Sequence, residues 1–171
     1  MRGRELILGL VAIFGALQVT IAATPDGVLV SPEGTVAVPT GAPVVRGRSF
    51  VPLHSTVVAG RGRTRLNVSG SLSIHNTSGR HVLVIDAIEY RDAAGRLVES
   101  YMSQPIGLRP FASMQVTIAQ DDVRGGIAPS FIVDWSSNEP IDEPAIEAVM
   151  IAWQGTQGFS MVSAARRLNR P

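Results

Sequence analysis

The sequence contains no cysteine and no lysine, and only 5% of its 171 residues are aromatic. The lack of cysteine excludes a disulfide-stabilised scaffold, a cysteine-ligated zinc or iron–sulfur site, catalysis by a thiol, and lipid attachment through a thioether. The sequence also lacks an excess of one charge, because it contains 15 arginines and 14 acidic residues and its formal net charge is +1. This balance argues against nucleic acid as a partner, since nucleic-acid-binding domains usually carry a strong basic excess.

Residues 1–23 combine a short positive start with a long apolar run. Arg2 and Arg4 precede residues 6–23, which are almost wholly apolar and end in two alanines, an order typical of a secretory signal peptide. The run also suits an uncleaved membrane anchor, because a span needs about 20 apolar residues. Both interpretations predict an N-terminal apolar helix and place residues 24–171 beyond the membrane. The anchor would be formed by the bulky apolar side chains, which are Leu6, Ile7, Leu8, Leu10, Val11, Ile13, Phe14 and Leu17.

Residues 24–48 are rich in proline and glycine, with short valine-rich pieces between them. A proline or glycine every few residues predicts an extended tether that could include one edge strand. The folded domain is therefore expected to comprise residues 49–171.

Segments of the 49–171 region alternate between apolar and polar residues, which is the pattern of β-strands with one buried face. Residues 66–74 and 114–119 show this alternation, and residues 131–135 place Phe, Val and Trp on one face. Seven or eight such short strands, mostly with one polar face, predict an all-β fold. The expected architecture is an antiparallel, immunoglobulin-like β-sandwich.

The sequence also predicts one clear turn between strands and one candidate helical turn. Asp92 and Gly95 bracket the clearest hairpin turn in the chain, because Asp caps such turns and Gly adopts the left-handed conformation that closes them. No segment after residue 50 has a convincing helical period, and residues 142–148 are the best candidate for one turn of helix.

Candidate chemistry in the chain is sparse. The sequence holds no Gly-x-Ser-x-Gly elbow and no glycine-rich phosphate loop. Asp121 and Asp122 precede the pair Gly125–Gly126, and carboxylate and carbonyl oxygens in such a loop can bind calcium. Asp and Gly are equally the ordinary residues of a surface turn, which is the favoured interpretation. His75 and His81 flank another turn and form a weaker metal candidate.

The region from residue 50 to residue 167 resembles a bacterial exported family known as domain of unknown function 3124. The resemblance rests on five segments, which are VPLHS at 51–55, LSIHNT at 72–77, YRDAAGRLV at 90–98, NEPIDEPAIEAVMI at 138–151 and QGTQGFS at 154–160. His54 departs from the tyrosine that is usual in the family, and Trp153 interrupts the family's run of small residues before Gln154. The resemblance implies a small exported bacterial domain, on the periplasmic side of the inner membrane, with no assigned activity.

The same segments suggest where a shared function would reside. Glu143, Glu147, Gln154 and Gln157 are polar residues in an otherwise apolar, strand-like neighbourhood. They are a candidate binding patch at one end of the sandwich, and the alternative is that they satisfy hydrogen bonds of an irregular loop.

The sequence thus predicts a non-catalytic exported envelope module without a cofactor. It would bind another envelope or membrane protein, or serve as an accessory subunit of a membrane complex. The alternative is a periplasmic metal- or ligand-binding protein, or an enzyme, that uses Asp121, Asp122 or the region 143–157.

Overall fold

The computed structural model describes residues 27–59 and 62–169, and within them the chain is built from antiparallel strands. The one helical element in this part is a single 3-10 turn, η1 (Pro32–Gly34). Within the same ranges, no helix has the length and apolar character needed to cross a bilayer. The all-β prediction is confirmed, whereas the predicted N-terminal helix and its anchor residues lie outside the described residues.

Two sheets carry most of the structure. The first sheet has the strand order β1 (Val28–Val30), β10 (Ser113–Ile118), β6 (Ser69–His75), β12 (Ala145–Gln154) and β13 (Gln157–Ala164). The second has the order β14 (Arg166–Arg167), β3 (Val45–Pro52), β11 (Ser130–Ser137), β7 (Leu83–Arg91), β9 (Ile106–Leu108) and β2 (Thr35–Val36), with β8 (Leu97–Ser100) paired to the end of β7. Strands β4 (Thr56–Ala59) and β5 (Thr64–Asn67) form a separate two-stranded ribbon.

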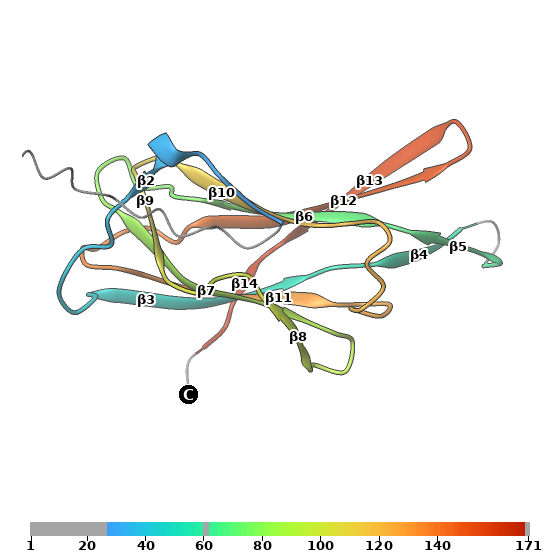
Figure 1. Ribbon diagram of the computed structural model, residues 1–171, viewed down its shortest axis with the longest axis horizontal. Helices are drawn as coiled ribbons and strands as arrows, with labels where there is room; N and C mark the ends of the chain where they lie inside the picture. The colour runs from blue at the N-terminus through green and yellow to red at the C-terminus, as the bar shows by residue number, and fades with distance from the viewer. Residues whose placement is uncertain (1–26, 60–61, 170–171) are drawn as a thin grey trace, which may run out of the picture.

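The two sheets form two layers (Figure 1), and one cluster of apolar side chains fills the space between them. Val116 of β10 and Val133 of β11 are fully buried, and Trp135 is 1% exposed. The alternation found in the sequence therefore identifies the inward faces of these strands correctly. Alternate residues of a strand point to opposite sides, so one apolar set per strand suffices to build the core.

The segment expected to be a tether contributes to both sheets. Strands β1 and β2 lie within residues 24–48, and β3 begins there at Val45. Val28 pairs with Val116, and Val45 pairs with Ser137. Short valine-rich pieces at sheet edges tolerate the neighbouring prolines, because an edge strand needs only one side of its backbone for pairing.

The predicted helical turn at 142–148 is wrong. Ala145 begins strand β12, which pairs with β6 from Ala145 opposite His75 to Ile151 opposite Ser69. Pro140 and Pro144 each disfavour helical geometry in the residue before them. Pairing with a neighbour on both sides then stabilises the extended form.

Strands β12 and β13 form a long hairpin that extends past the end of β6 (Figure 1). Gln154 pairs with Gln157, so the turn consists of Gly155 and Thr156. Gly155 has a φ of 60°, as the first central position of a type II′ turn requires. The Gln-Gly-Thr-Gln segment that carries part of the family resemblance is thus the tip of this hairpin.

Candidate functional site

The four predicted binding residues do not gather in one place. Glu143 precedes β12 and accepts a hydrogen bond from Arg167, whereas Glu147 lies exposed on β12. Gln154 and Gln157 occupy the far end of the hairpin. Strand β12 has ten residues, and at about 3.3 Å per residue it spans about 30 Å. The structure therefore distributes these residues along a strand, and not in an irregular loop.

Asp121 and Asp122, the candidate calcium ligands, lie in the turn after β10. Asp122 Oδ1 accepts from Arg124 Nε at 3.0 Å, and Asp122 Oδ2 accepts from Arg124 Nη2 at 2.9 Å. Hydrogen bonding by Arg124 lowers the pKa of Asp122. Arg124 also contacts Glu99 at 2.9 Å. These contacts are those of a capped turn, in which Asp122 already has a cationic partner.

No cluster of three or more His, Asp or Glu side chains with metal-binding geometry occurs in residues 27–59 and 62–169. His75 and His81, the weaker candidate, flank a loop that is organised by the buried Asn76. The Nδ2 atom of Asn76 lies 2.9 Å from the His81 carbonyl oxygen.

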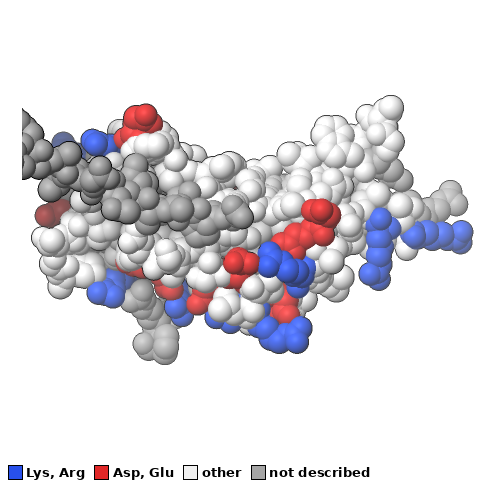
Figure 2. Space-filling model, viewed as in Figure 1, with Lys and Arg blue, Asp and Glu red and all other residues white. Residues whose placement is uncertain are grey.

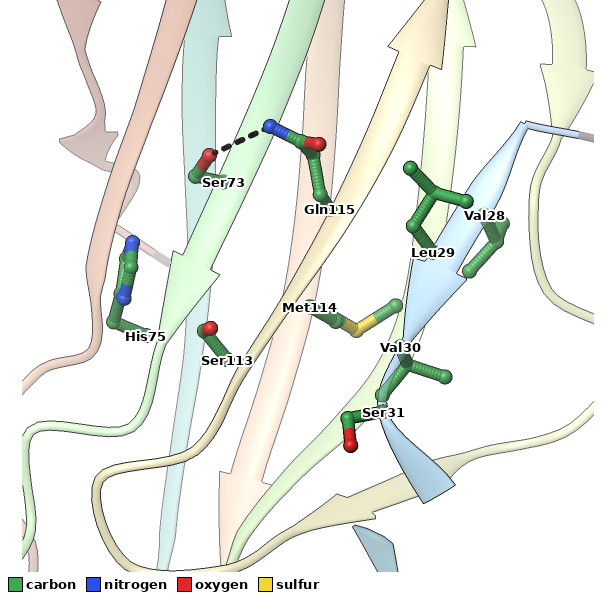
Figure 3. Close-up of a pocket in the computed structure, with 9 residues that line it drawn as sticks. All are labelled: Val28, Leu29, Val30, Ser31, Ser73, His75, Ser113, Met114 and Gln115. Carbon is green, nitrogen blue, oxygen red and sulfur yellow. Dashed lines mark hydrogen bonds between the residues drawn. The ribbon is translucent and has the colours of Figure 1, made fainter. Parts of the chain in front are cut away.

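A shallow groove of about 700 Å³ runs over the outer face of β1, β10 and β6. Figure 3 shows Gln115 donating to Ser73 across the strand pair, with Nε2 and Oγ 3.5 Å apart. His75 lies on β6 beside Ser113, its partner on β10 (Figure 3). The groove thus presents small hydroxyl side chains and apolar ones, with a single ionisable group.

A second groove, of about 750 Å³, crosses the outer face of the other sheet. Arg48 Nε and Nη2 contact Asp134 Oδ1 and Oδ2 at 2.8 and 2.7 Å, a bidentate pair. The Asp134 carboxylate raises the pKa of Arg48. The floor of the groove therefore contains a cross-strand ion pair between β3 and β11. In this pair the two opposite charges neutralise each other.

The most unusual surface lies on the hairpin. Val149, Ile151 and Trp153 of β12 share one face, and Val149 pairs with Val162 of β13. Ile151 is 40% exposed, Trp153 62% and Val162 63%. We call these four residues the hairpin patch. Figure 2 shows the projecting hairpin as an uncharged region at the upper right of the molecule.

Trp153 is held in a defined position on this face. It pairs with Gly158, and a Cβ atom at Gly158 would lie 2.6 Å from Cζ3 of the indole ring. The ring therefore rests directly on the backbone of the edge strand. Its other face remains open, as the exposed fraction indicates.

Val149, Ile151 and Trp153 are alternate residues in the sequence, and the register places them on one side of β12. Alternation in the sequence does not identify that side as the outer one. The inner side carries Ala148 and Met150, which are fully buried. Both faces of β12 are apolar, so alternation alone did not distinguish them.

Comparison with known proteins gives a family for this chain. A family described as a protein of unknown function, DUF3124, matches residues 46–168. The chain belongs to the DUF3124 family. The resemblance seen in the sequence is thereby confirmed, and the DUF3124 match extends from β3 to just beyond β14.

No curated protein matches the chain. Among solved structures, one described as the crystal structure of Thermotoga maritima 1070 is similar, with a TM-score of 0.45 and 17% sequence identity. The similarity covers 70% of this chain and 92% of that one.

Proposed function

We propose that this chain is a non-catalytic exported module that binds another envelope or membrane protein through the hairpin patch. In this proposal the two layers form an immunoglobulin-like sandwich on the periplasmic side of the bacterial inner membrane. The module is either released after cleavage of residues 1–23 or held there as the accessory subunit of a membrane complex.

The observation that carries the proposal is the exposure of the hairpin patch. Trp153 and Val162 are each more than 60% exposed, on a hairpin that extends beyond the core. A contiguous exposed apolar surface costs free energy in water, at roughly 25 cal/mol per Å² of apolar area. Such surfaces on soluble domains mark sites of protein or membrane contact.

The composition of the patch favours a protein as the partner. Tryptophan is enriched among the residues that dominate protein–protein binding energies. The patch has no charged member, and charged residues are depleted from the buried centres of interfaces. An indole ring held against Gly158 also loses little conformational freedom on binding.

Export is supported by the order of residues 1–23, in which two arginines precede an apolar run. Retention of this segment would keep the module beside membrane proteins, whereas its removal would leave a free periplasmic domain. The N-terminal mass of the native protein distinguishes the two forms.

The experiment is capture from detergent-solubilised envelope with the full chain as bait, followed by a binding assay with the identified protein in purified form. The test variant is Trp153→Ser combined with Val162→Ser. The matched control is Leu97→Ser combined with Val44→Ser, because Leu97 is 54% and Val44 65% exposed elsewhere on the molecule.

We expect the test variant to weaken binding by at least about 30-fold, which corresponds to about 2 kcal/mol. The control is expected to bind like the unmodified chain. Equal binding by the test variant, or recovery of the bare chain alone, would overturn the proposal.

A further inference from the structure

Strand β13 forms an edge of the five-stranded sheet, and this edge is a feature separate from the outer face that carries the hairpin patch. Strand β13 pairs with β12 through eight consecutive residues without a bulge. In the described part of the chain no strand pairs with its other side. Its sequence, QGFSMVSA, contains neither a charged residue nor a proline.

The other edges of the two sheets are protected in ordinary ways. Strand β1 has three residues and β2 has two. Strand β14 consists of two arginines. Short strands and charged side chains are the common means of preventing unwanted pairing at a sheet edge. A long, regular, uncharged edge such as β13 is therefore a surface suited to pairing with another strand.

The backbone groups that would make this pairing follow from the hairpin. In a two-residue hairpin, the residues that flank the turn form a hydrogen-bonded pair, and the pairs then alternate along the ladder. Gln157 and every second residue after it thus direct their N–H and C=O groups toward β12. Gly158, Ser160 and Val162 direct theirs toward the open edge.

The side chains of β13 are self-complementary when a second copy runs antiparallel with Ser160 opposite Ser160. Phe159 then faces Met161, so two apolar residues meet on the inner side. Gly158 faces Val162 on the outer face of the sheet. The backbone N–H and C=O groups of both residues point toward the open edge. Because the Trp153 ring covers Gly158, it would lie beside Val162 of the second copy. The two-fold symmetry produces each of these contacts twice.

We propose that β13 pairs with β13 of a second copy of this chain in this register, which joins two five-stranded sheets into one sheet of ten strands. This inference goes beyond the proposed function. Pairing in the plane of the sheet fills the edge and leaves the outer face open. The hairpin patches of the two copies then lie on one outer face, on either side of the paired Ser160 residues, and remain available to the envelope partner.

The test uses the full chain in detergent, treated with a short thiol-reactive cross-linker. The chain has no native cysteine, so Ser160→Cys introduces a unique thiol at the proposed two-fold axis. The register control is Thr156→Cys, which is also exposed on the same hairpin. In the proposed register two copies of residue 156 lie about 27 Å apart, beyond the reach of the linker.

We expect at least about tenfold more cross-linked pair from Ser160→Cys than from Thr156→Cys. Adding Phe159→Arg to the Ser160→Cys chain places a charge on the paired edge and should reduce the yield by a similar factor. Circular dichroism verifies that each variant is folded. Equal yields at the two positions, or no cross-linked pair at either, overturn the inference.

Failure of this inference can be distinguished from failure of the proposed function. A chain that gives no cross-linked pair but captures its envelope partner through the hairpin patch contradicts only the second-copy inference. A chain that cross-links through Ser160→Cys but binds no other protein contradicts only the proposed function.

Discussion

Trp135 of β11 lies against the backbone of Gly47, its partner on β3. A Cβ atom at Gly47 would lie 2.2 Å from two carbons of the indole ring. The indole N–H donates to the Ser49 hydroxyl at 3.2 Å, and the guanidinium of Arg167 lies 5.7 Å from the ring centroid. Glycine is therefore required at position 47 because a large side chain occupies the space that a methyl group would need.

Gly47→Ala is accordingly expected to destabilise the fold by about 1–3 kcal/mol or more, since the fixed indole cannot move without disturbing the core. Urea unfolding monitored by tryptophan fluorescence measures the change. Gly34→Ala is the control, because a Cβ there would meet Ala112 at an ordinary 3.4 Å. Equal stability of the two variants would mean that the indole is not held as described.

Asn76, which is 2% exposed, connects two loops at one end of the sheets. Its Nδ2 lies 2.9, 3.1 and 2.9 Å from the carbonyl oxygens of His81, Leu108 and Arg109. Its Oδ1 accepts from the backbone N–H of Ser78 at 3.0 Å. Asn76→Ala leaves these buried groups unpaired and should cost about 2–4 kcal/mol.

The matched control is Asn138→Ala, whose side chain donates to the Thr40 carbonyl at a more exposed site. We expect a loss below about 1 kcal/mol for this control. Thermal unfolding of both variants measures the difference. A loss at Asn76 no larger than at Asn138 contradicts the structural role assigned to Asn76.

The ion pair between Asp122 and Arg124 predicts a specific dependence of stability on pH. Arg124 lowers the pKa of Asp122 in the folded state, while the unfolded value is about 3.9. Between these two values the unfolded chain binds more protons, so stability rises with pH across this window. The contribution is complete above about pH 5 and is lost as the pH falls through the folded pKa.

Asp122→Asn should therefore lower stability at pH 7 by about 1 kcal/mol, and its difference from the unmodified chain should shrink below about pH 4. Unfolding by urea at a series of pH values provides the curve. Asp121→Asn is the charge-matched control from the same turn and should change stability less at pH 7. A difference that persists unchanged in acid contradicts the assignment.

Calcium tests the alternative in which the chain is a metal-binding protein. Both carboxylate oxygens of Asp122 accept hydrogen bonds from Arg124, so an ion would have to displace a guanidinium. We expect millimolar calcium to shift the unfolding temperature no more than magnesium does. A calcium-specific rise that Asp121→Asn abolishes would support the alternative function instead.

The fold was largely predictable because most strands have one apolar and one polar face. The turn at Asp92 and Gly95 was predictable from local chemistry, and Gly95 adopts a φ of 79° there. The strands in residues 24–48 were less predictable. They are short and separated by prolines, so the local sequence lacks a strand pattern, and only pairing with neighbouring strands stabilises them. Strand β12 carries apolar residues on both faces, so its buried side depends on which face meets the other layer.

The candidate site was less predictable than the fold. Glu143 and Gln157 are close in sequence, but a strand of ten residues separates them in space. The exposure of Trp153 follows from its place on the outer face of β12, and no local pattern in the sequence reports which face of that strand meets the other layer. The open edge of β13 likewise depends on which strands do not pair with it.

The measurement that tests the central claim most directly is photo-cross-linking in the living cell. A photoreactive amino acid replaces Trp153 in the full chain, and a second variant carries it at Leu97, which is also exposed but lies on β8. We predict a discrete adduct from position 153 whose added mass differs from that of the chain itself, beside the adduct between two copies that the second-copy inference expects. We predict no such adduct from position 97. No adduct at position 153, or the same adduct from both positions, would contradict the claim that this module acts by contact through its hairpin.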